Sequence, residues 1–168
     1  TVLQQKIEDG SVTEHAFDGL PTIYAAQNVF EIKINLPAAN VRFFSPFDNA
    51  IIHRDRVQQL FEFDYRLECY LPKEKRQFGY FCLPVLYRDK LVGQVDCKAH
   101  RKTGVFELIH LHLNDQSIDL DRFISHFTKT IYRFAAFNAC HSLRVSNISP
   151  KKLAGAIKRA LNAVEQLN

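Results

Sequence analysis

The sequence YRLECYLPKEKRQFGYFCLPVLYRDKLVGQVDCKAHRKTGVFELIHLHL, residues 65–113, decides the predicted fold. Apolar and polar residues alternate in much of it, as is typical of half-buried strands, because successive side chains of a strand point to opposite faces. The pattern predicts four strands, at 65–71, 78–86, 91–99 and 105–113, joined by the short polar segments 72–77, 87–90 and 100–104. Such a series predicts an antiparallel meander that must curl or be covered to protect its edges, so we expect a small β-barrel or a strongly curved sheet.

Helical patterns follow the predicted sheet. A stretch that begins at Asp119 or Asp121, either of which can cap a helix, has apolar residues at three- and four-residue spacing to about residue 140. This stripe predicts a helix that covers one face of the sheet. After a short extended piece at 143–146, Ser149-Pro150 supplies an N-cap residue and a proline suited to the first helical position, which predicts a final amphipathic helix.

The residues before the sheet begin with a helix and a hairpin. Apolar spacing predicts a helix over 2–9 that Gly10 ends, and two short extended segments flank the turn-forming pair Asp18-Gly19. A helix followed by a hairpin forms the back half of a winged helix. We therefore expect residues 1–40 to be the C-terminal part of a winged-helix domain with its connector, which we place at 37–40. Residues 41–168 would then form a β-barrel-like α+β domain with two C-terminal helices.

A strand, a turn and a short helix open this second predicted domain. Residues 41–44 have a strand pattern, residues 45–49 contain a pre-proline break, and residues 54–61 have apolar side chains at helical spacing. We expect these three elements, in that order, to lead into the meander.

The composition is that of a folded domain with a mild basic excess. Of 168 residues, 46% are hydrophobic and 24% charged, which excludes a disordered chain, and 22 Lys and Arg against 18 Asp and Glu give a net charge of +4. That charge suits a polyanionic partner but is common in proteins without one. The apolar stretches are much shorter than the roughly 18 residues of a membrane span, so we expect no membrane partner. The lack of Met and the helical start predict a segment of a longer protein.

The residues that could carry chemistry form no recognisable catalytic set. We find no nucleophile with a base, no paired carboxylates and no glycine-rich phosphate loop. The four cysteines lack metal-binding spacing, and Cys69, Cys82 and Cys97 lie in strand-like runs, so we interpret the cysteines as reduced, cytoplasmic and structural. His110 and His112, at i and i+2 on one face of a strand, can ligate a metal, but without a third ligand we favour a half-exposed polar face. The sequence therefore predicts no metal and no cofactor.

Basic residues gather around the predicted connections of the meander. They are Lys73, Lys75, Arg76, Lys98, Arg101 and Lys102. The first and third connections of an up-and-down meander lie at the same end of the sheet, so two cationic hairpin tips would project together. Such tips can straddle the phosphate backbone of duplex DNA, because each neutralised phosphate releases counterions. The alternative is that charged tips only keep the loops solvated and the sheet edges unpaired.

An ordered run of short motifs extends over about two thirds of the chain. The motifs are FSPFDN at 44–49, RDR at 54–56, LFEFDYRLE at 60–68, YLP at 70–72, KR at 75–76, GY at 79–80, LPVL at 83–86 and LVGQVD at 91–96, with Lys98 and Arg101-Lys102. Together they resemble the C-terminal half of the YcaQ family of winged-helix DNA glycosylases, related to AlkZ, over residues 2 to about 113. The resemblance implies tandem winged helices followed by a small β-barrel, and an enzyme that unhooks interstrand cross-links and excises bulky alkylated bases.

The resemblance also indicates what this chain lacks. The family's catalytic Gln-x-Asp or Gln-x-Gln motif belongs to the N-terminal winged helix, which is not in this sequence. Gln94-Val95-Asp96 has the same letters, but similar proteins usually read Gly-Arg-Val-Asp in that predicted strand, so we interpret it as non-catalytic and predict no catalytic residue here. Asp48, Asn49 and Arg54 carry over as channel-lining or structural residues, and Asp48 can equally cap the segment that follows it.

The resemblance implies a role for this chain within a larger enzyme. It would be the C-terminal DNA-contacting and scaffold portion of a glycosylase that acts on damaged or cross-linked duplex DNA, in a bacterial cytoplasm and associated with the nucleoid. The upstream amide and carboxylate would position water against an oxocarbenium-like sugar, and this segment alone would be inactive. The alternatives are a non-catalytic winged-helix DNA-binding or regulatory protein whose barrel is an interaction module, and a structural or oligomerising domain.

Overall fold

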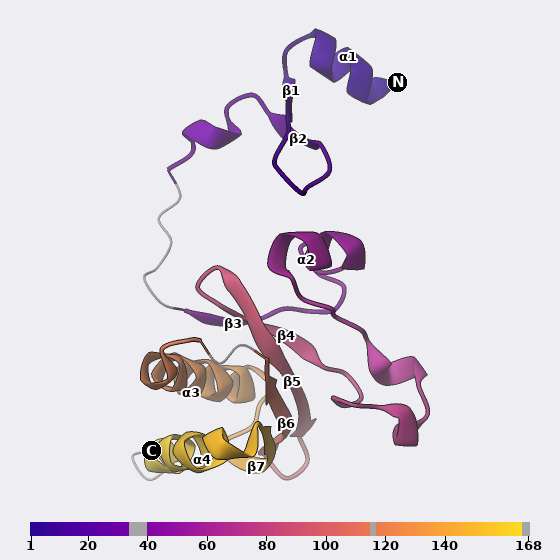
Figure 1. Ribbon diagram of the computed structural model, residues 1–168. Coiled ribbons are helices and arrows are strands. Elements are labelled where there is room, and N and C mark those ends of the chain that lie inside the picture. Colours follow the sequence, from indigo (N-terminus) through magenta and orange to yellow (C-terminus); the bar gives the residue numbers. More distant parts are fainter. Residues whose placement is uncertain (34–39, 115–116, 166–168) are drawn as a thin grey trace. The chain divides into compact units, whose positions relative to one another are not determined.

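The structure is a computed structural model that describes residues 1–33, 40–114 and 117–165 (Figure 1). The chain divides into two compact units, Thr1–Pro37 and Ala38–Asn168. The connector that the sequence predicts at 37–40 lies, apart from Asn40, outside the described residues. None of the helices in the described ranges is both long enough and apolar enough to cross a membrane.

The first unit has the predicted helix and hairpin. Helix α1 (Val2–Glu8) is followed by Gly10, whose φ of +75° is the left-handed conformation that ends many helices. Strands β1 (Val12–His15) and β2 (Ile23–Ala26) pair antiparallel, and a 3₁₀ turn, η1 (Val29–Glu31), follows them. None of the described residues of this unit is buried. Its assignment to a winged helix stays a prediction.

The second unit contains a five-stranded sheet in the order β3-β4-β5-β6-β7. The strands are β3 (Val41–Phe43), β4 (Leu83–Tyr87), β5 (Lys90–His100), β6 (Val105–Leu113) and β7 (Ser142–Ser149). Neighbouring strands are antiparallel except β6 and β7, which are parallel. Because β3 and β7 are the two edges, the described residues form an open mixed sheet. The expected antiparallel barrel is therefore wrong, while the α+β class is confirmed. The alternative expectation, a strongly curved sheet, stays a prediction.

The parallel strand arises from helix α3 (Leu120–Phe137), which separates β6 from β7 in the sequence. Parallel neighbours need a crossover, and a helix packed on the sheet usually supplies it. The helix begins as predicted, since the Asp119 side chain accepts a hydrogen bond from the Arg122 backbone nitrogen at 3.2 Å. Ser149, in contrast, is the last residue of β7, and Pro150 separates it from the final helix, α4 (Lys151–Glu165).

The strand predicted at 65–71 is wrong. Residues 62–82 are irregular, with two 3₁₀ turns, η2 (Glu68–Tyr70) and η3 (Lys73–Lys75). The alternating pattern has a different origin here, because the Tyr65 ring is buried and its hydroxyl donates to the Cys82 carbonyl at 2.6 Å. Glu68 is buried as well, although it belongs to the polar set of the alternating pattern. The burial of these side chains therefore reflects individual contacts and not a strand ladder.

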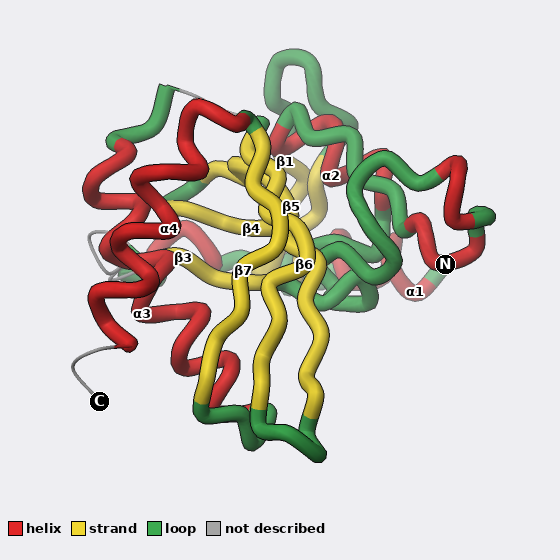
Figure 2. The backbone as a smooth tube through the Cα atoms, turned by 90° about the horizontal axis from the view of Figure 1, so that it is seen from below, coloured by secondary structure: helices red, strands yellow, loops and turns green. Residues whose placement is uncertain are grey.

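Helices α3 and α4 cover one face of the sheet (Figure 2). The core between these layers joins Leu108 and Leu111 of β6 to Phe127 and Ile131 of α3 and to Ile157 of α4. A smaller cluster lies around helix α2 (Arg54–Phe61), which has the predicted bounds, and includes Val57, Phe63 and Tyr65. The opposite face of β5, β6 and β7 carries polar side chains.

Candidate nucleic-acid interface

The polar face of the sheet lies opposite α3 and α4, and we call it the outer face. Its residues are Gln94, Asp96, Lys98 and His100 of β5, Glu107, His110 and His112 of β6, and Arg144, Ser146 and Ser149 of β7. The register places Gln94 opposite His112, Asp96 opposite His110, and Lys98 opposite Glu107. The pairing skips Ile109, so a bulge keeps both halves of β6 on the same face.

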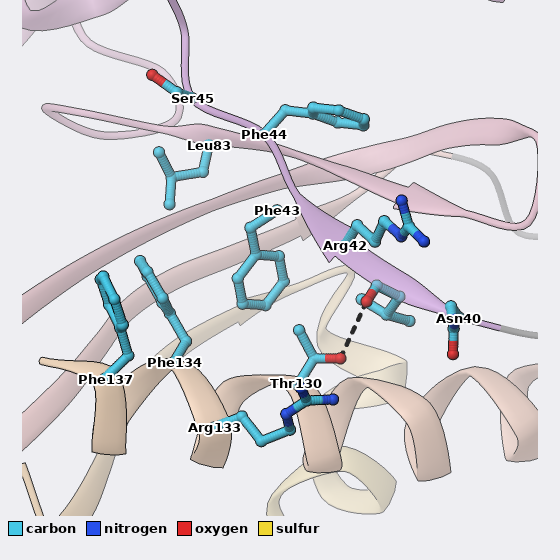
Figure 3. Close-up of a pocket in the computed structure, with 11 residues that line it drawn as sticks. Asn40, Arg42, Phe43, Phe44, Ser45, Leu83, Thr130, Arg133, Phe134 and Phe137 are labelled. Atoms are coloured by element: carbon cyan, nitrogen blue, oxygen red, sulfur yellow. Dashed lines mark hydrogen bonds between the residues drawn. The ribbon is translucent and has the colours of Figure 1, made fainter. Parts of the chain in front are cut away.

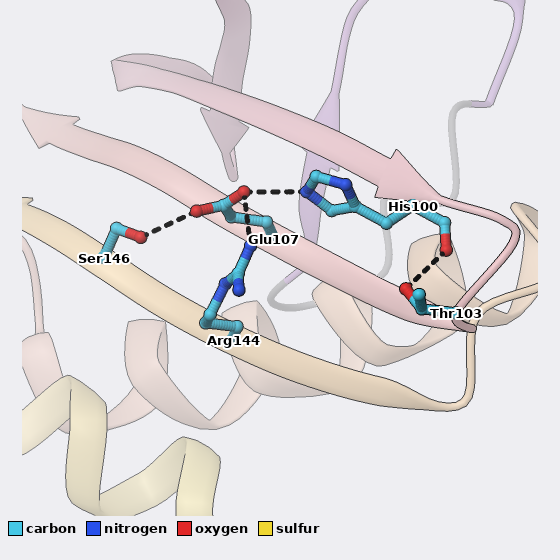
Figure 4. Close-up of polar contacts among 5 residues, drawn as sticks. All are labelled: His100, Thr103, Glu107, Arg144 and Ser146. Carbon is cyan, nitrogen blue, oxygen red and sulfur yellow. Dashed lines mark hydrogen bonds and ion pairs between the residues drawn. The ribbon is translucent and has the colours of Figure 1, made fainter.

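Glu107 is the centre of a polar cluster at the end of the outer face where β5 ends and β6 and β7 begin (Figure 4). Its carboxylate lies 2.8 Å from His100 Nε2 and 3.0 Å from Arg144 Nη2, and it accepts a hydrogen bond from the Ser146 hydroxyl at 3.0 Å. The hydrogen bond with His100, followed by that from Arg144, lowers the pKa of Glu107 to about 2. This carboxylate is therefore ionised and already paired.

Glu107→Gln is expected to lower the free energy of unfolding by about 1–2 kcal/mol at pH 7, because hydrogen bonds to a partly exposed carboxylate contribute on this scale. The folded-state pKa of about 2 lies below the usual 4.5, so this contribution is complete above pH 4.5. It is lost as the pH falls toward 2. Urea unfolding of the wild type and of Glu107→Gln at pH 7, 4 and 3 measures the difference in their free energies of unfolding, which is expected to become smaller as the pH falls.

The matched control for this pH series is Glu74→Gln, which changes an exposed carboxylate in η3. It is expected to change the free energy of unfolding by less than about 0.5 kcal/mol. A difference between wild type and Glu107→Gln that stays constant from pH 7 to pH 3 would contradict the ionised cluster.

The other half of the outer face is covered by residues 77–80. The Asp96 carboxylate accepts a hydrogen bond from the Tyr80 backbone nitrogen at 2.7 Å, and a Cβ on Gly79 would lie 2.2 Å from Asp96 Oδ2. His110 Nδ1 lies 3.0 Å from the Phe78 carbonyl. Because a carbonyl oxygen only accepts, this ring nitrogen carries the proton. The segment is therefore attached to β5 and β6 through several contacts, and Gly79 permits the close approach.

The two histidines do lie on one strand face, with ring centroids 6.0 Å apart. His110 Nε2 lies 3.0 Å from the Ser149 hydroxyl. Burial, together with the neighbouring His110, lowers the pKa of His112, which favours its neutral ring. Over the ranges that the structure describes, no group of three or more His, Cys, Asp or Glu residues could hold a metal ion.

The four cysteines are free thiols. Of the three expected in strand-like runs, Cys97 lies in β5, whereas Cys69 lies in η2 and Cys82 just precedes β4. Burial raises the pKa of Cys82 to about 12 and also raises that of Cys97, so both thiols stay protonated near pH 7.

Gln94 and Asp96 have the letters of a catalytic Gln-x-Asp motif, but both side chains are covered. Gln94 is 2% exposed and Asp96 is 4% exposed. The Asp96 carboxylate accepts a hydrogen bond from the Tyr80 backbone nitrogen, while Gln94 Oε1 has no hydrogen-bond partner among the described residues. These positions support the interpretation that this pair is structural, because a group that activates water against DNA has to face an open cleft.

The predicted basic residues divide into two groups. Lys98 lies on β5, and Arg101 and Lys102 lie in the β5–β6 turn, where all three are exposed. Arg101 Nη2 donates to Asn138 Oδ1 at 3.1 Å. Since Glu107 pairs with Arg144 and lies opposite Lys98, the structure adds Arg144 to this group. We call Lys98, Arg101, Lys102 and Arg144 the cationic end.

The second basic group does not occupy a hairpin tip. Lys73 and Lys75 are exposed in η3. The Arg76 guanidinium donates to the Leu71 carbonyl at 2.9 Å and lies 4.8 Å from the centroid of the Tyr80 ring. Because residues 65–71 are not a strand, the expectation that two hairpin tips project at one end of the sheet is wrong. DNA contacts of this group stay a prediction.

Local hydrogen bonds stabilise the turn formed by the FSPFDN segment, residues 44–49. Asp48 Oδ1 accepts from the Ala50 backbone nitrogen at 2.8 Å, which is a local cap, and the Asn49 carbonyl accepts from Arg56. The Arg54 guanidinium donates to the Ile51 and Pro46 carbonyls at 2.6 and 3.1 Å and lies over the Tyr65 ring. These contacts support the structural reading of Asp48 and Arg54.

Comparison with known families supplies the identity that geometry alone does not. The family model for AlkZ-like DNA glycosylases matches residues 1–137. The chain belongs to this family. For this AlkZ-like chain, membership indicates DNA repair and DNA as a partner, and it confirms the resemblance that the motifs between residues 2 and 113 carry. The matched residues end with α3, so β7 and α4 lie beyond them. No solved structure matches the chain.

Sequence reasoning about this AlkZ-like chain missed Arg144 and Ser146, and it assigned no context to His100. The first two lie on β7, and the parallel pairing with β6 places Arg144 beside Glu107, 37 residues away in the chain. Neither residue belongs to a basic run or a motif. The alternating pattern of β6 could indicate that Glu107 faces away from the core, but it contains no information about the neighbouring strand.

Proposed function

We propose that this AlkZ-like chain is the DNA-contacting and scaffold portion of a DNA glycosylase that excises alkylated or cross-linked bases. Its cationic end would bind the phosphate backbone. The observation that carries the proposal is that Lys98, Arg101, Lys102 and Arg144 lie on one end of β5, β6 and β7, while the acidic residue among them, Glu107, is already paired. The exposed charge there is positive.

The framework of the cationic end suits backbone contacts. Lys98 and Arg144 project from paired strands, so their spacing is set by the sheet, and Arg101 is held by Asn138. Each phosphate that such a residue neutralises releases counterions, which strengthens binding without reading the base sequence. The cationic end would therefore position the duplex and leave lesion recognition to other parts of the enzyme.

Lys73, Lys75 and Arg76 form a second proposed phosphate-contacting group. They lie in the segment whose residues 77–80 are attached to β5 and β6. This attachment limits the movement of the group although it belongs to an irregular segment. We propose that it extends the contact surface beyond the cationic end.

Charge reversal tests the proposal. The triple variant Lys98→Glu, Arg101→Glu and Lys102→Glu is expected to bind a fluorescent duplex roughly 100-fold more weakly at low salt, because three phosphate contacts become repulsive. The slope of log affinity against log salt is expected to become shallower by about 2 to 3. Fluorescence anisotropy of the full chain across a salt series measures both quantities.

The control variant reverses Lys129, Lys151 and Lys152, which are exposed on α3 and α4 and change the net charge equally. Its affinity is expected to fall by less than about 5-fold. Equal losses in the two variants would mean that only overall charge matters, and unchanged binding in the first variant would remove the cationic end from the DNA contact.

A further inference from the structure

A pocket of about 710 Å³ lies between strand β3 and helix α3, away from the outer face (Figure 3). Its walls include Phe43 of β3 and Phe134 and Phe137 of α3, together with Arg42 and Arg133. Among the described residues that line it, none carries a carboxylate. This volume is within the usual range of small-ligand sites, which combine apolar walls with a few polar groups.

The aromatic wall of this pocket is partly open to solvent. Phe137, in the last position of α3, is 84% exposed. Phe134, one turn earlier, packs edge-to-face on Phe43 with ring centroids 5.7 Å apart. Figure 3 shows the Phe134 and Phe137 rings side by side at one end of the pocket. Phe137 thus presents a planar apolar surface that the rest of the described chain leaves largely uncovered.

The charge of the pocket comes from two arginines. Arg133 precedes Phe137 by four residues, so the two side chains lie on the same side of the helix, and Arg42 projects from β3. Among the described residues, neither guanidinium has an acidic partner. Two unpaired guanidinium groups that line the same pocket as an exposed aromatic ring complement a ligand that has both a flat π surface and a negative charge.

The pocket also adjoins the cationic end. Asn138, the residue after Phe137, accepts a hydrogen bond from Arg101 at 3.1 Å. A DNA strand held by Arg101 would therefore pass close to the exposed ring. The bases of a duplex are stacked inside it, and only an unpaired or extruded base can stack on a protein side chain.

We propose that this pocket takes an unpaired base of DNA, stacked on Phe137, while Arg133 and Arg42 bind the flanking phosphates. The inference rests on the proposed function, because it needs DNA on the neighbouring cationic end. It goes beyond that function by assigning a subsite for a distorted strand. The alternative occupant is an acidic segment of a partner protein. Such a segment would pair with the two arginines, but it would not need an aromatic ring to stack on.

A tryptophan reporter tests the subsite directly, because the chain contains no Trp. Phe137→Trp introduces a single indole at an exposed position, and stacking of a base on it is expected to quench its fluorescence. The probes are a duplex with one unpaired thymine and the same duplex fully paired. We expect the first to quench at least 2-fold more strongly than the second. Phe30→Trp, at a 65% exposed position of the first unit, is the control and should not distinguish the probes.

Affinity measurements separate this inference from the proposed function. Phe137→Ala and Arg133→Ala are each expected to lower affinity for the duplex with the unpaired thymine about 10-fold and to leave affinity for the paired duplex unchanged. If the paired duplex binds but the unpaired thymine brings neither tighter binding nor extra quenching, the subsite is wrong and the proposed function stands. If neither duplex binds, both fail.

Discussion

Phe127→Ala is expected to lower the free energy of unfolding of the second unit by about 3–5 kcal/mol, the usual cost of removing a buried phenyl ring. The Phe127 side chain is fully buried between α3 and the sheet. Its ring lies 5.6 Å from that of Phe123 and 5.8 Å from that of Phe43, so the substitution removes contacts on both layers. The resulting cavity cannot collapse easily, because the surrounding side chains belong to a paired strand and to the same helix.

Urea unfolding followed by circular dichroism measures this loss. Phe137→Ala is the matched control, since it makes the same chemical change ten residues later on the same helix at an 84% exposed position. Its expected effect is within about 0.5 kcal/mol. Similar losses in the two variants would mean that α3 does not pack on the sheet as described.

Glu68→Ala is expected to cost about 2–4 kcal/mol and to release the segment that follows it. The buried Glu68 carboxylate accepts hydrogen bonds from the backbone nitrogens of Gln77, Phe78 and Gly79 at 3.1, 2.8 and 3.2 Å. Removing it leaves three donors without their acceptor, at about 1 kcal/mol or more each. Burial alone would raise the pKa of Glu68, but the three donors outweigh it and the pKa lies below its usual value. This stabilisation is therefore present at neutral pH and is lost on acidification.

Limited trypsin digestion reports the release specifically, because Lys73, Lys75 and Arg76 lie in the segment. The Glu68→Ala variant is expected to be cleaved there at least 10-fold faster than wild type, while Glu74→Ala, at an exposed position in η3, is cleaved at the wild-type rate. Unchanged cleavage of the Glu68 variant would show that the segment is held by other contacts. Since these cations are proposed to contact phosphate, the same variant measures how far DNA binding depends on their attachment.

The local elements of this protein could be predicted from the sequence because their determinants are local. Helix α2 and strand β6 have the predicted bounds, and the Asp119 cap and the Gly10 terminator lie where expected. Each depends on side-chain periodicity or on a backbone preference within a few residues. The ordered motifs between residues 44 and 96 likewise determine family membership, because a match to a family needs no coordinates.

The tertiary structure alone decided which segments pair and which polar groups meet. The alternation at 65–71 predicts that one set of alternate side chains is buried. Tyr65 and Glu68 belong to opposite sets, yet both are buried, because the Tyr65 hydroxyl donates to the Cys82 carbonyl and the Glu68 carboxylate accepts from three backbone nitrogens. Likewise, no local pattern places Arg144 beside Glu107, because β7 reaches β6 only after the α3 crossover. A periodicity reports the faces of a segment, whereas its neighbours are chosen by the packing of the whole domain.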